Sequence, residues 1–118
     1  MPFQFEKLKV WNVALQLSVK ISELVKSFPK DELFILTSQI KRAADSVVLN
    51  IAEGSTLQSK TEFRRFLIIA NRSAIEVVSC LYIARKRNFI NNENFEELYS
   101  DYEKLIISIQ ALIRSLNT

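Results

Sequence analysis

Polar side chains form a line along one predicted helix, and this line is the grouping in the chain that most looks like a site. If each helical residue turns by about 100°, the line occupies one sector of about 80° that borders the apolar face. Its members are Gln39, Arg42, Ser46, Asn50 and Glu53. The next predicted helix carries a matching set in Arg65, Ser73 and Glu76. Such a set can either fix helix register as a paired structural network or form a polar ligand site.

The numbering of the two sets favours direct pairing. If the two helices form an antiparallel hairpin that turns near residue 59, facing residues have numbers that sum to about 118. The facing pairs are then Arg42 with Glu76, Ser46 with Ser73, and Glu53 with Arg65. Both charged pairs join opposite signs. We therefore predict two ion pairs across the hairpin, with Asn50 and the two serines completing the hydrogen bonds.

Residue types that most enzymes need are absent from this chain. It has no histidine, which excludes a Ser-His-Asp triad, an imidazole metal ligand and the Glu-x-x-His motif of di-iron bundles. A single glycine, Gly54, leaves no phosphate-cradling loop. The carboxylates lie mostly at helix ends or beside basic residues, where solvation or capping is their default role. The sequence therefore predicts a protein that is not an enzyme and holds neither metal nor cofactor.

Cys80 is the only cysteine, so no disulfide can form within the chain. A small buried side chain is the favoured interpretation of Cys80, and a reactive thiol is the alternative. The N-terminus lacks the basic-then-apolar run of a secretory signal. No stretch approaches about 18 uncharged apolar residues, so we expect no membrane span. These features predict a cytoplasmic protein.

The elements that must position the polar line are predicted to be four helices. Apolar residues recur at steps of three and four, the period of helix bundles. Pro29 ends the first helix. Thr37 or Ser38 caps the second, which runs to about Glu53 and is closed by Gly54 in a left-handed conformation. Ser59 and Glu62 form a capping box for the third, and Asn92 caps the fourth. Short connections then give an all-α, antiparallel up-down-up-down four-helix bundle, with residues 1–118 as one domain.

Positive charge is concentrated on the third helix, although the net charge of the chain is only +3. Residues 55–90 hold seven Lys and Arg against two Glu. Part of this charge is ordinary helix-end electrostatics, facing the acidic start of the fourth helix. The alternative is a nucleic-acid-binding face, which a ring of subunits would repeat as a basic band. Its candidate residues are Lys60, Arg64, Arg72, Arg85, Lys86 and Arg87.

Several apolar residues fall outside the four core stripes and cannot all face the centre of one bundle. They are Val48, Leu49, Ile68, Ile75, Val78, Ile83, Ile106 and Ile107. A small monomer rarely exposes contiguous apolar patches. The sequence therefore predicts self-association, most simply as a closed symmetric oligomer.

The second predicted helix also carries a specific motif. Residues 39–54 read Q-I-K-R-A-A-D-S-V-V-L-N-I-A-E-G. They resemble the signature Q-I-x-R-A-A-x-S-[IV]-x-x-N-I-A-E-G of a four-helix-bundle family whose members are often labelled ribosomal-RNA intervening-sequence proteins. The resemblance continues upstream through residues 8–11 and 28–36, and downstream through residues 62–76, so it spans nearly the whole chain.

This resemblance implies a ring-like homo-oligomer, commonly a pentamer, with no known catalytic activity. The polar positions of the family match Arg42, Ser46, Asn50, Glu53, Ser73 and Glu76 here. A related branch, the accessory variability protein of diversity-generating retroelements, binds nucleic acid and a reverse transcriptase. We expect a non-enzymatic oligomeric scaffold or interaction protein whose partner is itself. The alternative is a nucleic-acid-binding accessory module that uses the basic face of the third helix.

Overall fold

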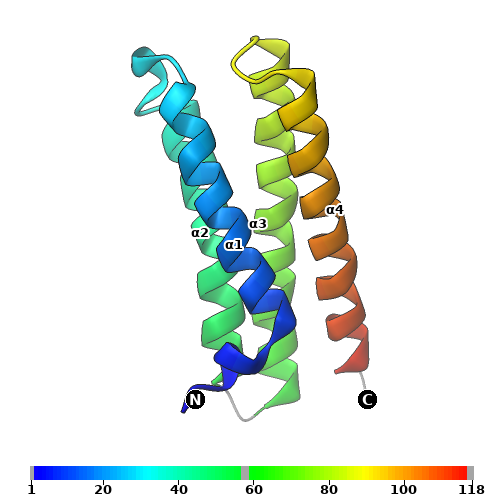
Figure 1. The fold of residues 1–118 in the computed structure, drawn as a ribbon. Coiled ribbons are helices and arrows are strands. Elements are labelled where there is room, and N and C mark those ends of the chain that lie inside the picture. Colours follow the sequence, from blue (N-terminus) through cyan, green and yellow to red (C-terminus); the bar gives the residue numbers. More distant parts are fainter. Residues whose placement is uncertain (1, 57–58, 117–118) are drawn as a thin grey trace.

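The computed structural model describes residues 2–56 and 59–116, and these form the four predicted helices. They are α1 (Lys9–Leu24), α2 (Leu36–Ser55), α3 (Lys60–Lys86) and α4 (Asn92–Ser115). Short 3₁₀ turns precede α1 and connect it to α2: η1 (Gln4–Lys7), η2 (Val25–Ser27) and η3 (Lys30–Glu32). Successive helices run antiparallel, so both chain ends lie at one end of the bundle (Figure 1). The predicted fold class is confirmed.

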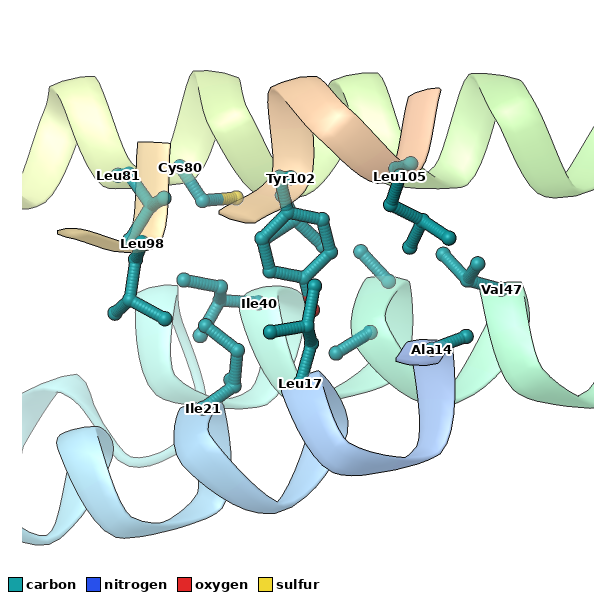
Figure 2. Packing of buried hydrophobic residues seen from close by; sticks show 14 of the residues in the cluster. Ala14, Leu17, Ile21, Ile40, Val47, Cys80, Leu81, Leu98, Tyr102 and Leu105 are labelled. Carbon is teal, nitrogen blue, oxygen red and sulfur yellow. The ribbon is translucent and has the colours of Figure 1, made fainter. Parts of the chain in front are cut away.

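One continuous apolar core holds the four helices together. α2 contributes Ile40, Val47 and Ile51, which are fully or almost fully buried, and α3 contributes several small side chains. Figure 2 shows Tyr102 of α4 reaching across this core toward Leu17 of α1 and Ile40 of α2. The bundle is 44 Å long and 22 Å wide. That length is about the length of a 27-residue helix at 1.5 Å per residue, so α3 spans the whole molecule.

Two of the predicted helix ends are confirmed by the structure. Ser59 caps α3, because its Oγ accepts a hydrogen bond from the Glu62 backbone N–H at 3.2 Å. Phe28 is extended, as expected for a residue before proline, and the helical path stops there. The regular part of α1 ends slightly earlier, at Leu24, and a 3₁₀ turn completes it.

The prediction for the end of α2 is wrong. Gly54 is buried inside the helix, which continues to Ser55, and no described glycine has a positive φ. A Cβ atom at Gly54 would lie only 2.7 Å from Phe66 Cβ and 3.0 Å from Phe63 Cδ1. The glycine is therefore required by the close approach of α3, not by a left-handed cap.

The caps predicted for α2 and α4 are also corrected. Thr37 lies within α2 and is buried, and no side chain caps this helix at its N-terminus. In α4 the cap is Asn91 instead of Asn92: its side chain accepts from the Asn94 backbone N–H at 2.7 Å. Among the described residues, the left-handed one is Asn88 (φ 63°), which closes α3 together with a bond from Phe89 N to Ala84 O. Asn is the non-glycine residue that best tolerates this conformation.

α3 also has the length and apolar content of a membrane-spanning helix, which no other described helix has. Its most apolar stretch of 18 residues has a mean hydropathy of 1.6. In the structure this helix is the longest element of the bundle, and seven of its residues are buried in the core. Only 33% of the apolar stretch is buried in the bundle, so packing within one chain accounts for part of its apolar content.

Candidate functional site

The inner part of the polar line comes together as predicted. Ser46 Oγ and Ser73 Oγ lie 2.9 Å apart across the seam between α2 and α3. Asn50 Nδ2 donates to Ser46 Oγ at 3.0 Å and to the Ser46 carbonyl at 2.9 Å. These three side chains are half-buried, so their polar groups depend on one another for hydrogen bonds. The contacts are those of a structural network that bridges the two helices.

The predicted ion pair between Arg42 and Glu76 is wrong. Glu76 Oε2 accepts a hydrogen bond from Gln39 Nε2 at 3.3 Å instead. Arg42 is exposed and has no carboxylate within 4 Å among the described residues. Both residues nevertheless line one shallow pocket of about 480 Å³ at the outer edge of the seam, so the predicted register is right. Water solvates both charges there, and little is gained by pairing them.

The predicted pair between Glu53 and Arg65 is wrong as well. Arg65 forms a two-pronged ion pair with Glu62, one turn earlier on α3, at 2.9 and 3.3 Å. The hydrogen bond from Arg65 lowers the pKa of the Glu62 carboxyl. The Arg65 guanidinium also lies 4.9 Å from the centre of the Phe66 ring. A partner three residues away on the same helix is always within reach, whereas a partner across the seam must be brought there.

The basic residues of α3 do not gather on one patch. Arg85 lies 3.7 Å from Glu96 and over the Phe95 ring, and Arg87 lies 3.8 Å from Glu32. Lys60 and Lys86 are at opposite ends of the helix. Arg72 is exposed, whereas Arg64 is half-buried with a buried Nε that lacks a hydrogen-bond partner. Four cations of α3 make no ion pair with a described residue: Arg64, which is half-buried, and the exposed Lys60, Arg72 and Lys86, which are spread along about 39 Å of helix.

Two buried side chains have the chemistry of potential reactive groups. Burial raises the pKa of the Cys80 thiol to about 11, with a smaller contribution from Glu76, so the thiol is protonated at neutral pH. Tyr102 is also buried, and its hydroxyl has no hydrogen-bond partner. Burial raises the pKa of this phenol. Within residues 2–56 and 59–116, no three acidic or cysteine side chains come close enough to hold a metal ion.

The outer face of the α3–α4 pair carries an apolar groove. It is lined by Ile75, Val78, Tyr99, Glu103, Ile106 and Ile107, and has a volume of about 230 Å³. Ile75 is 50% exposed and Ile107 57% exposed. We call these six residues the outer groove.

The outer groove was predicted only in part: its aliphatic residues were expected and its tyrosine was not. Ile75, Val78, Ile106 and Ile107 are among the residues predicted to lie outside the core. Val48, from the same set, is buried at 8% exposure, because it packs in the core of the bundle. Tyr82 and Tyr99, whose rings lie 6.2 Å apart across the same seam, were not predicted. On α3, Tyr82 follows Ile75 by seven residues, and on α4, Tyr99 precedes Ile106 by seven residues. This spacing of two helical turns places each tyrosine in line with the apolar residues of its helix, and it could have predicted both.

A second exposed apolar feature lies in the connection from α1 to α2. Leu33, Phe34 and Ile35 are 54%, 89% and 60% exposed. We call these three residues the apolar tip. The 3₁₀ turn at Lys30–Glu32 ends just before the tip. The exposed tip could have been predicted from the sequence, because loops are normally polar and this connection contains three consecutive apolar residues.

These features define an all-α bundle protein with exposed apolar surfaces and no assembled catalytic group among its described residues. The chain belongs to the 23S rRNA-intervening sequence protein family, which matches residues 6–111. It is similar to a crystal structure from Bacteroides thetaiotaomicron, described as a protein of unknown function from the S23 ribosomal protein family. The identity is 27%, the match covers 88% of this chain and 97% of that one, and the TM-score is 0.82. No curated protein matches the chain.

Proposed function

We propose that this protein is a non-enzymatic cytoplasmic scaffold that acts as a homo-oligomer, with five subunits as the family resemblance implies. The outer groove is the observation that carries the proposal. It places two half-exposed isoleucines, Ile75 and Ile107, beside a tyrosine and two further apolar side chains. Surfaces of this kind on small proteins mark interaction sites.

The energetics of the groove favour coverage by protein. Removing a large aliphatic side chain fully from water contributes about 1.5–3 kcal/mol, and the groove offers several at once. Of the six residues that line it, Glu103 is the charged one and the other five are aliphatic or aromatic. Protein interfaces are likewise depleted of charge and enriched in aromatic residues at their core.

Nucleic-acid binding is the competing proposal, and the charges of α3 give it less support. Arg65, Arg85 and Arg87 already lie close to carboxylates, and the exposed remaining ones, Lys60, Arg72 and Lys86, are far apart along the helix. A phosphate-binding surface would give an affinity that falls steeply with salt. Titration with mixed RNA and DNA at 20 mM and 150 mM salt tests it. Measurable binding that disappears at the higher salt and weakens in Arg72→Ala would support this alternative.

Light scattering after size exclusion tests the scaffold proposal. We expect the wild-type chain at micromolar concentration to have several times its monomer mass of 13.7 kDa. Ile75→Asp places a charge in the centre of the outer groove, so this variant is expected to be monomeric with an unchanged helical circular dichroism spectrum. Val19→Asp is the matched control, because Val19 is 57% exposed on α1 and does not line the groove. A monomeric wild type contradicts the proposal.

A further inference from the structure

The apolar tip is the most exposed large apolar segment of the described chain. Phe34 is 89% exposed, and Leu33 and Ile35 on either side are more than half exposed. The tip lies at the end of the bundle where α1 connects to α2, beside the turn between α3 and α4 (Figure 1). Exposed apolar patches mark interaction sites, and interfaces are enriched in aromatic residues such as Phe, so the tip has the composition of an interface and not of a solvated loop.

The base of the tip is held in place by the rest of the fold. Backbone bonds join Leu33 N to Lys30 O at 3.2 Å and Ile35 N to Glu32 O at 3.0 Å. Glu32 lies 3.8 Å from Arg87 at the end of α3. Just before the tip, the Phe28 ring packs against Phe89, with ring centres 5.8 Å apart. The tip is therefore presented in a fixed position, which lowers the entropy that docking would cost.

We propose that the apolar tip of one copy of this chain docks into the outer groove of a second copy. The inference rests on the proposed function, and it names the two surfaces that meet. Each chain carries one projecting apolar segment and one apolar groove, so a single kind of contact covers both. The groove contains Tyr99 beside Ile75 and Ile107, which provides aromatic and aliphatic contacts for the Phe34 ring.

The charges at the edges of the two surfaces agree with this pairing. Glu103 lines the outer groove and Lys30 stands three residues before the tip. Neither forms an ion pair with another described residue. Docking can bring these opposite charges together at the rim, where they guide orientation more than they add affinity. Asp31 beside Lys30 makes this contribution small.

A chain does not fill its own groove, because the two surfaces flank α3 on different sides. Phe34 and Ile35 line the shallow pocket that also contains Glu76. Ile75 lines the outer groove. Neighbouring helical residues point about 100° apart, so the tip lies on the α2 side of α3 and the groove on its α4 side. A contact between unlike surfaces can repeat from subunit to subunit and close into a ring.

A mixing experiment tests this contact. Phe34→Asp removes the tip and keeps the groove, whereas Ile75→Asp removes the groove and keeps the tip. Each variant alone is expected to be monomeric, at a concentration where the wild type is assembled. Mixed in equal amounts, they retain one intact tip and one intact groove. The mixture is therefore expected to form a 1:1 complex of about twice 13.7 kDa. Circular dichroism checks that both variants are folded, and Val19→Asp is again the control that remains assembled.

The outcomes separate the two proposals. A 1:1 complex from two monomeric variants supports docking of the tip in the groove. If the wild type is assembled, two results overturn the docking and leave the scaffold proposal intact. One is a Phe34→Asp variant that assembles as fully as the wild type, and the other is a mixture of the two variants that stays monomeric. A monomeric wild type overturns both.

Discussion

Between α2 and α3 small residues let the two helices approach closely, whereas between α1 and α4 a long side chain spans a wider seam. On the first seam Gly54 meets Phe66, and Ser46 meets Ser73 at 2.9 Å. On the second, Lys20 reaches Asp101 at 2.9 Å and Glu97 at 3.5 Å. Cavities of about 300 and 420 Å³, both bordered by Lys20, lie along the second seam.

The difference shows where a polar contact stabilises this fold. The half-buried hydroxyls between α2 and α3 lose contact with water on folding and must hydrogen-bond to each other, so their geometry is strongly determined. The Lys20 side chain is 46% exposed, so water and salt compete with its carboxylate partners. We call the α2–α3 contact the close seam and the α1–α4 contact the open seam. We expect substitutions on the close seam to cost more stability than those on the open seam.

The largest effect is expected at Gly54. Gly54→Val would place a Cβ at 2.7 Å from Phe66 Cβ and add two methyl groups beyond it. Overpacking of this kind typically costs about 1–3 kcal/mol, more than the helix gains from losing a glycine. Urea unfolding at a fixed protein concentration measures the loss, with Ala52→Val on the same helix as the control. Equal stability of the two variants would show that the seam is not closely packed.

A smaller loss is expected at the serine pair. Ser46→Ala removes the partner of Ser73 and of Asn50, and one such hydrogen bond contributes about 1 kcal/mol. Because Ser46→Ala already breaks the bond that the two serines share, the double variant Ser46→Ala with Ser73→Ala should cost little more than Ser46→Ala alone, whereas Ser73→Ala alone keeps the bond from Asn50 to Ser46 and should cost less. A double-mutant cycle with urea unfolding measures this. Strictly additive losses would mean that the hydroxyls act independently.

Lys20 on the open seam is expected to contribute less, and its contribution depends on pH. Lys20→Met should cost about 0–1 kcal/mol, and less in 0.5 M salt. The hydrogen bond with Asp101 raises the pKa of Lys20 above 10.5. Its stabilisation is therefore fully present below pH 10.5 and is lost as the pH rises through the folded-state value. The difference in unfolding free energy between wild type and variant at pH 9 and pH 11.5 tests this, and a difference that grows with pH would contradict it.

The smallest effect is expected at Arg42. The side chain is exposed and lacks a carboxylate partner, so Arg42→Met should change the unfolding free energy by no more than about 0.5 kcal/mol. Thermal unfolding of wild type and variant side by side is sufficient to measure this. A loss of about 3 kcal/mol would instead indicate the buried ion pair that the sequence suggested.

Patterns in the sequence were sufficient for the helices and for the pairing of α2 with α3. Apolar spacing predicted the four helices, and the turn near residue 59 predicted that Ser46 faces Ser73. The same numbering could not select ionic partners. Arg65 had Glu62 and Glu53 within plausible reach, and the free energies of such surface pairs differ by less than about 1 kcal/mol. Only the folded geometry decides between them.

Gly54 and Asn88 show what the sequence by itself determined and what the tertiary structure decided. Many helices end in a left-handed residue, and a lone glycine is the natural candidate for it. The fold places Asn88 in that conformation instead and uses Gly54 where α3 approaches α2. The sequence determined the fold class, because helix periodicity is a local property that each segment carries. The role of the glycine, the ionic partners and the exposed groove depend on how close two helices come, and that distance exists only in the packed bundle.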